Sequence, residues 1–181
     1  MNICVFGAAR DEIDPGFFNL GERFGRAIAK RGHTLIFGGG AHGLMGAVAR
    51  GCAAGGGEIV SVVPYFFNEP GVLWERNTEL IRMETLAERK TVMEERADAF
   101  VALPGGIGTF DEIFEVLTMR NLGRHRKPIA FLDHDGYWQS AVDLLENSVR
   151  RGFAAPRLLE LFGRFDDPEA CLDYLAKEAV K

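Results

Sequence analysis

The sequence predicts an α/β domain in which a doubly wound, mostly parallel sheet carries helices on both faces. Three observations support this prediction: short apolar runs that suit buried strands, intervening segments with helical spacing of apolar residues, and dense glycine clusters after two of the strands. Continuous apolar runs are typical of parallel strands, because helices cover both sides of such a sheet. The length of 181 residues suits a single nucleotide-binding domain over residues 1–181.

The order of elements follows from the apolar runs and from the helical spacing of apolar residues. Phe17, Phe24 and Ile28 recur at the spacing of a helix face, and Pro64 and Pro104 stop strands because proline cannot donate to a ladder. The predicted strands are 3–6, 35–37, 59–63, 79–83, 99–103, 129–132 and, at an edge, 161–165. The predicted helices are 17–30, 44–54, 86–96, 110–122, 138–149 and 167–179, the last one capped by Asp166 or Asp167. Residues 65–76 are expected to be irregular and aromatic.

In Rossmann-like sheets of this kind, ligands bind outside the carboxyl ends of the strands. The first glycine loop, GGGAHGLMG at 38–46, follows one such end and contains G-x-G-x-x-G. It follows the second strand and lacks a suitably placed acidic residue, so it is a weak dinucleotide signal. Two interpretations remain open: a tight turn without ligand, or a phosphate, sugar or base lying against bare backbone.

The second glycine loop, PGGIGTFDE at 104–112, is more specific. Its backbone N–H groups can converge on an anion at the positive end of a helix that is expected to begin near Thr109. No lysine follows, so a triphosphate site is not indicated, and a monophosphate suits the loop. A plain capped turn is the alternative.

Two charged features each allow two interpretations. Glu112 is expected in the first helical turn, either as a partner of the helix dipole or as a carboxylate beside a substrate. The segment 84–96 is rich in Glu, Arg and Lys, which is also typical of a solvated helix face with i,i+4 pairs. On sequence alone, the solvated face is favoured for that segment.

Composition excludes several classes of function. The net charge is −5 and no basic run is present, which argues against a nucleic-acid partner. The three cysteines are scattered, so neither a disulfide framework nor a metal site is expected. No apolar run approaches the roughly 20 residues of a membrane span, and no signal-peptide pattern opens the chain. We therefore expect a cytoplasmic protein without a membrane partner.

The two glycine loops, together with ERKTVM at 88–93, resemble the motifs of the LOG (“Lonely Guy”) family over roughly residues 2–155. This family comprises cytokinin riboside 5′-monophosphate phosphoribohydrolases, long misnamed lysine decarboxylases. The resemblance implies hydrolysis of the base–sugar bond of an adenosine 5′-monophosphate, with or without an N6 substituent. It implies no cofactor and no metal, and a homodimer or larger assembly with the active site near the interface. The chain departs from the family in having Gly7-Ala8-Ala9 where Gly-Ser-Ser is usual.

The resemblance also implies roles for particular residues. Arg89 and Glu112 match the catalytic pair. Implied or expected substrate contacts are Glu69, Lys90, Met93, Gly105, Gly106, Gly108, Thr109 and Thr118, and Gly39, Gly40, Gly43 and Met45 of the first glycine loop. Two alternatives stay open: a non-catalytic nucleotide or molybdenum-cofactor carrier on the same fold, and a nucleoside monophosphate nucleosidase with little base preference.

Overall fold

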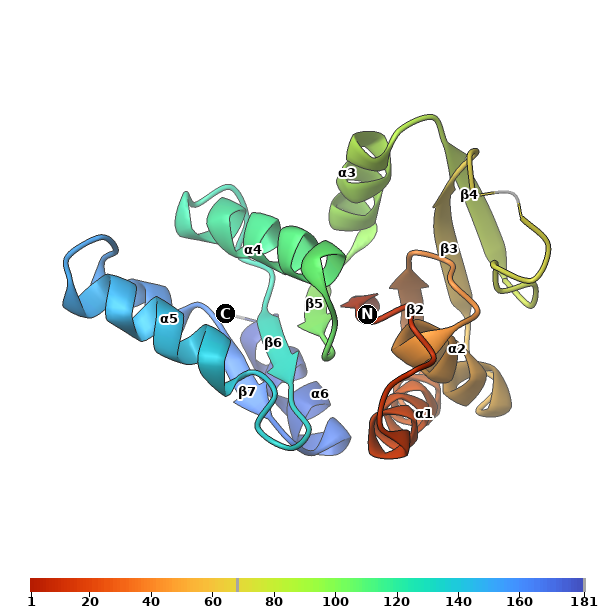
Figure 1. Cartoon of the computed structure of the whole chain (residues 1–181), viewed down its shortest axis with the longest axis horizontal. Coiled ribbons are helices and arrows are strands. Elements are labelled where there is room, and N and C mark those ends of the chain that lie inside the picture. Colours follow the sequence, from red (N-terminus) through yellow and green to blue (C-terminus); the bar gives the residue numbers. More distant parts are fainter. Residues whose placement is uncertain (68, 181) are drawn as a thin grey trace.

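The computed structural model of the protein describes residues 1–67 and 69–180, and these form one seven-stranded sheet with helices on both sides (Figure 1). The strands are β1 (Asn2–Phe6), β2 (Thr34–Phe37), β3 (Ile59–Pro64), β4 (Glu79–Met83), β5 (Ala99–Ala102), β6 (Ile129–Leu132) and β7 (Gly163–Phe165). Their order across the sheet is β4-β3-β2-β1-β5-β6-β7, and every neighbouring pair is parallel. The predicted Rossmann-like α/β fold is confirmed, with a sheet that is parallel throughout.

In the described part of the chain, six α-helices cover the two faces of the sheet (Figure 1). On one face lie α1 (Pro15–Lys30), α2 (Gly43–Ala54) and α6 (Pro168–Glu178), and on the other lie α3 (Leu86–Arg96), α4 (Ile107–Asn121) and α5 (Gln139–Arg150). A short 3₁₀ helix, Pro156–Glu160, precedes β7 and was not predicted.

Five of the strands, β1, β2, β3, β5 and β6, supply side chains to two separate cores. In β1, Ile3 and Val5 pack with α1, α2 and α6, whereas Cys4 and Phe6 pack with α3 and α4. This alternation follows from the period of two along a strand, and the continuous apolar run was its sequence signal. All four side chains are at most 2% exposed, and each large one contributes about 1.5–3 kcal/mol of burial free energy.

The main difference from the predicted elements concerns the start of α4. The helix begins at Ile107, not at residue 110, and its N-cap is Gly106. The glycines at 106 and 108 tolerate helical geometry, although their low helix propensity suggested a longer loop. The remaining helices and strands begin and end within about two residues of their predicted limits.

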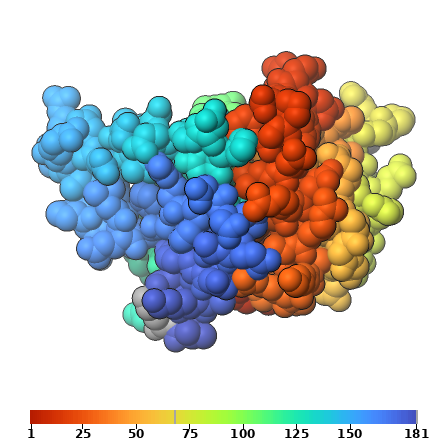
Figure 2. Space-filling model, turned by 90° about the horizontal axis from the view of Figure 1, so that it is seen from below, coloured from red at the N-terminus to blue at the C-terminus, as the bar shows by residue number. Residues whose placement is uncertain are grey.

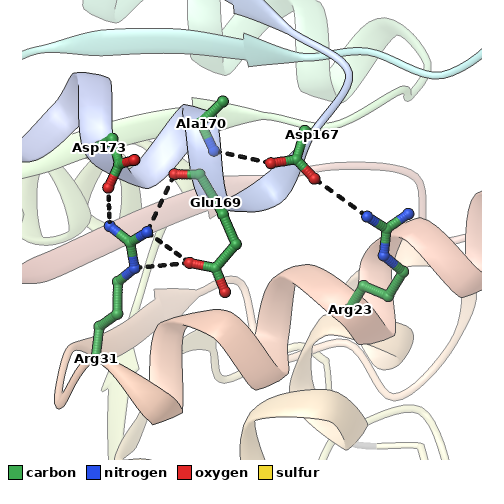
Figure 3. A network of polar contacts seen from close by, with 6 residues as sticks. All are labelled: Arg23, Arg31, Asp167, Glu169, Ala170 and Asp173. Carbon is green, nitrogen blue, oxygen red and sulfur yellow. Dashed lines mark hydrogen bonds and ion pairs between the residues drawn. The ribbon is translucent and has the colours of Figure 1, made fainter.

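The C-terminal helix α6 is tied to α1 by charged side chains (Figure 3). Arg31 contacts Glu169 and Asp173, and Arg23 contacts Asp167 at 3.2 Å. Asp167 also accepts a hydrogen bond from the backbone of Ala170, so it is the predicted N-cap of this helix. The space-filling view from below shows these two helices in contact (Figure 2). The network therefore holds the last helix against the first.

Across residues 1–67 and 69–180, no helix combines the length and apolar character needed to cross a lipid bilayer.

Candidate active site

The strand order reverses beside β1. The chain runs outward from β1 through β2 and β3 to β4, then returns to β5 on the other side of β1. At such a point the loops at the carboxyl ends separate and leave a crevice. A cavity of about 600 Å³ lies here, walled by the loops after β1, β2, β5 and β6, the start of α4, and the side chains of Phe67, Val72 and Leu73. The backbone N–H of Ala8 donates to Pro104 O at 3.0 Å and links the loops after β1 and β5.

The second glycine loop leads into the N-terminus of α4 at this cavity. Gly105, Gly106, Gly108 and Thr109 all line it. The N-cap, Gly106, provides no side-chain acceptor, so the N–H groups of the first turn are left for another partner. At Gly105 a Cβ atom would lie 2.7 Å from Thr109 Cβ, so a side chain does not fit there. The geometry suits an anion bound at the helix N-terminus.

Arg89 and Glu112 meet at the wall of the same cavity. Arg89 Nη2 donates to Glu112 Oε1 at 3.0 Å, and the two side chains are only 14% and 13% exposed. The helix that carries Arg89 is held at its start by a capping box between Thr85 and Glu88. Arg89 Nε is buried without a hydrogen-bond partner in the described part of the chain. An unpaired buried donor beside a cavity suits a ligand that brings an acceptor.

The surroundings of Glu112 change the pKa of its carboxyl group. Burial raises the pKa of Glu112 above its ordinary value, and the positive charge of Arg89 opposes that rise. Glu112 is the sixth residue of α4, not a first-turn residue as expected, and the first turn contains no acidic residue. Because the dipole interaction fades beyond the first turn, a role as a simple dipole partner loses its basis.

The first glycine loop forms a second wall. Gly40 and Met45 line the cavity, together with Gly38. Gly43 has a φ of +60°, and a Cβ atom there would lie 2.7 Å from Arg10 N, so the loop after β1 packs on bare backbone. Gly39 does not line the cavity, and its carbonyl accepts a hydrogen bond from Trp74 N at 2.8 Å.

Backbone and side-chain contacts hold segment 71–74 against this loop. Ala41 N donates to Val72 O at 2.9 Å. His42 contacts Asp11 through Nδ1 at 2.7 Å and the carbonyl of Gly71 through Nε2 at 3.0 Å. The backbone N–H of Gly43 and the ring of His42 lower the pKa of Asp11. These contacts join the loop after β1, the first glycine loop and segment 71–74 at one rim of the cavity.

Six predicted substrate contacts do not line the cavity: Gly39 and Gly43 of the first glycine loop, and Glu69, Lys90, Met93 and Thr118. Lys90 pairs with Asp111 at 3.0 Å and with Glu115, and the contact with Glu115 is the main reason that the pKa of Lys90 is raised. Met93 is fully buried in the core. Thr118 is exposed, and its hydroxyl donates to Phe114 O at 2.7 Å. Glu69 is an exposed residue of the irregular segment. Their predicted roles remain predictions.

The structure brings to the cavity residues that the sequence analysis did not single out. Arg10, Phe17, Phe67 and Tyr137 line it, and the hydroxyl of Tyr137 donates to the carbonyl of Gly105. Arg10 and Tyr137 follow the carboxyl ends of β1 and β6, so the rule for ligand sites in parallel sheets could have found them. Among the residues that the structure describes, no group of three or more His, Cys, Asp or Glu is placed to hold a metal ion.

The fold and the cavity define a Rossmann-like α/β protein with a cavity at the N-terminus of a helix, at the point where the strand order reverses. Residues 45–175 match the protein family described as “Possible lysine decarboxylase”. Cytokinin riboside 5′-monophosphate phosphoribohydrolase LOG7 of Arabidopsis thaliana is 36% identical over 154 residues, covering 85% of this chain and 71% of that protein. The phosphoribohydrolase of Rhodococcoides fascians is 38% identical over 156 residues, covering 86% of this chain and 79% of that protein. The chain therefore belongs to the LOG family of phosphoribohydrolases.

Solved structures share the fold at lower identity. The molybdenum cofactor binding protein of Rippkaea orientalis is 20% identical, with a TM-score of 0.75 over 99% of this chain and 97% of that one. The molybdenum cofactor carrier protein of Chlamydomonas reinhardtii is also 20% identical, with a TM-score of 0.75 over 99% and 98% of the two chains. At this level of identity, the similarity shows a common fold.

Proposed function

We propose that this chain hydrolyses the N-glycosidic bond of an adenosine 5′-monophosphate, with or without an N6 substituent, and releases the free base and ribose 5-phosphate. The observation that carries the proposal is the Arg89–Glu112 pair, joined at 3.0 Å on the wall of a cavity that also contains the N-terminus of α4. A cation, a carboxylate and an anion site thus share one cavity. The names of the family relatives support this substrate class.

In this proposal the 5′-phosphate binds at the second glycine loop. A phosphomonoester carries a charge of about −1.5 to −2 at neutral pH and has three acceptor oxygens. The free N–H groups at the start of α4 and the hydroxyl of Thr109 supply donors. The phosphate takes no part in bond cleavage. Its binding holds the sugar in place, which lowers the entropic part of the barrier.

Glu112 and Arg89 then act at the bond that is broken. Water adds to the anomeric carbon and releases one proton to solvent, the electrons of the carbon–nitrogen bond leave with the base, and the base takes a proton from solvent. The sugar gains positive charge in the transition state, so the carboxylate of Glu112 stabilises it and orients the water. Arg89 stays protonated and stabilises the leaving base by its charge. One such group is worth about 3–4 kcal/mol of barrier.

The base is proposed to lie against the apolar part of the wall. The apolar lining next to the first glycine loop consists of Phe67, Val72 and Leu73, and the start of α2 adds Leu44 and Met45. An adenine ring and an apolar N6 substituent bury surface there at about 25 cal/mol per Å². The apolar wall is the observation that favours an N6-substituted base.

The homodimer implied by the family resemblance is part of the same proposal. Ile107 lines the cavity at the start of α4 and is 83% exposed, an unusual state for an isoleucine. A second copy of the chain that covers this side chain would narrow the mouth of the cavity. Light scattering after size exclusion gives the mass: twice that of the 20.0 kDa chain supports the dimer, and a single chain mass at micromolar concentration contradicts it.

The proposed activity is tested by incubating the protein with AMP and with isopentenyladenosine monophosphate and measuring free base and ribose 5-phosphate by chromatography. Glu112→Gln should lose activity by about 100- to 1,000-fold. Glu115→Gln is the matched control, because it makes the same change on the same helix outside the cavity. It should retain activity within a few-fold.

Each other outcome has a defined meaning. If no monophosphate is cleaved while nucleotide still binds, the chain is a carrier on this fold. If several bases are released at similar rates, it is a nucleosidase without base preference. Cleavage that survives Glu112→Gln rules out the proposed role of Glu112.

A further inference from the structure

Arg10 occupies a central place between the two glycine loops. Two residues before it, the backbone N–H of Ala8 donates to Pro104 O at 3.0 Å, and the carbonyl of Ala8 accepts from Met45 N at 3.1 Å. The backbone N of Arg10 lies against Gly43, where a Cβ atom would come within 2.7 Å. Arg10 lines the same cavity as the second glycine loop.

The charges that line the cavity leave one cation without a buried partner. Three described residues with charged side chains line it: Arg10, Arg89 and Glu112. The last two form a pair at 3.0 Å, so their charges largely offset each other. The N-terminus of α4 adds only about half a positive charge. A phosphomonoester with a charge of about −1.5 to −2 therefore needs a further cation, and Arg10 is positioned to supply it.

Arg10 is held only weakly in the absence of a ligand. Its Nε lies 3.4 Å from Glu12 Oε2, at the long end of the hydrogen-bond range. The two side chains are 81% and 76% exposed, and such pairs contribute little to stability. Ala8 and Ala9 have no polar side-chain atoms. The guanidinium of Arg10 is thus the side-chain donor of this loop segment, and its planar fork suits two oxygens of a phosphate.

We propose that Arg10 is a phosphate-binding residue of this site, that it turns from Glu12 to the 5′-phosphate of the ligand, and that it determines the preference for phosphorylated over unphosphorylated ligands. Glu12 competes with the phosphate for the same guanidinium. This inference rests on the proposed function, because it identifies how the substrate's phosphate is recognised.

The test is calorimetric binding of ribose 5-phosphate, inorganic phosphate and adenine to the full chain, which requires no turnover. Arg10→Ala should weaken ribose 5-phosphate and inorganic phosphate by about 10- to 100-fold, the size of a charge-assisted hydrogen bond, and should leave adenine within two-fold. Arg10→Lys should recover part of the loss. Glu12→Gln should strengthen phosphate binding by about two- to five-fold, because it removes the competing negative charge.

Three results would overturn the inference: unchanged ribose 5-phosphate binding in Arg10→Ala, an equal loss of adenine binding, or no gain in Glu12→Gln. Both substituted side chains are exposed, so the variants should fold, and thermal melting checks this. If wild-type protein releases no base from any monophosphate but Arg10→Ala still loses ribose 5-phosphate selectively, the proposed hydrolysis fails and the phosphate site stands. If hydrolysis occurs and Arg10→Ala binds ribose 5-phosphate normally, the reverse holds.

Discussion

Replacing Gly38 by alanine tests whether contact with the first glycine loop positions Arg89. A Cβ atom at Gly38 would lie 2.9 Å from Arg89 Cζ, whereas non-bonded carbon atoms rest about 3.5–4.0 Å apart. The guanidinium must therefore retreat by about 1 Å. Gly38 is not among the glycines with positive φ, and the atoms it would meet end a flexible side chain. The fold should accordingly tolerate the extra methyl group.

The expected effect is on catalysis. Displacing a catalytic group by about 1 Å can cost about 100-fold in rate. That factor corresponds to about 2.7 kcal/mol of activation free energy. The assay is kcat for release of ribose 5-phosphate from AMP, with thermal melting measured on the same preparation. We expect kcat to fall by about 100-fold and the melting temperature to change by a few degrees at most.

A double-mutant cycle separates this explanation from a general disturbance of the loop. In an Arg89→Ala background, Gly38→Ala has no guanidinium to displace, so it should add less than about a two-fold loss. Wild-type kcat in the single Gly38→Ala variant would refute the reasoning. A full additional 100-fold loss in the Arg89→Ala background would do so as well, because the effect would then not act through Arg89.

Three further predictions concern protonation, the cavity rim and stability. Burial raises the pKa of Glu112, so activity should fall as the pH is lowered, with a midpoint above that of an ordinary glutamate. Because the charge of Arg89 lowers this pKa, Arg89→Ala should raise the pKa of Glu112 further, which a carboxyl NMR titration measures. A midpoint at the ordinary value would contradict this. The folded chain also binds this proton more tightly, so that contribution to stability is present at acid pH and is lost as the pH rises through the raised pKa. His42→Ala should speed amide hydrogen exchange at Trp74 about five- to ten-fold, because the hydrogen bonds of His42 with Asp11 and Gly71 are lost. Unchanged exchange would mean that His42 does not hold segment 71–74 against the first glycine loop. Arg31→Ala should lower the free energy of unfolding by about 1 kcal/mol in urea, since its partners are partly exposed; a loss above about 3 kcal/mol would mean that the pairs act as if buried.

The secondary structure was largely predictable because each element carries a local signal. The apolar run of β1 and the helical spacing of Phe17, Phe24 and Ile28 report burial on both faces of a strand and on one face of a helix. The tight second glycine loop was equally visible, since only glycine suits a position such as Gly105, where another backbone comes close. The start of α4 was misplaced because Gly106 and Gly108 are weak helix formers, and their conformation depends on packing beyond the local sequence.

The roles of the charged residues were not predictable from local patterns. By local pattern, Arg89 and its neighbours resemble a solvated helix face, and that pattern does not show that Met93 is buried in the core. The structure separates these residues, because it pairs Arg89 with Glu112 inside the cavity and leaves Lys90 paired with Asp111 outside it. Helix periodicity describes which side a residue faces, but not what lies opposite.

The sequence by itself determined the parallel α/β architecture, the edge of the sheet where the cavity lies and the glycine loop that lines it, because all three depend on residue types within short segments. Only the tertiary structure decided which side chains meet there. Arg10, Arg89 and Glu112 come from three separate segments, and they reach one cavity because the strand order reverses beside β1. The contact between Arg89 and Glu112, and the burial that raises the pKa of Glu112, arise only once α3 and α4 are packed on the same face of the sheet.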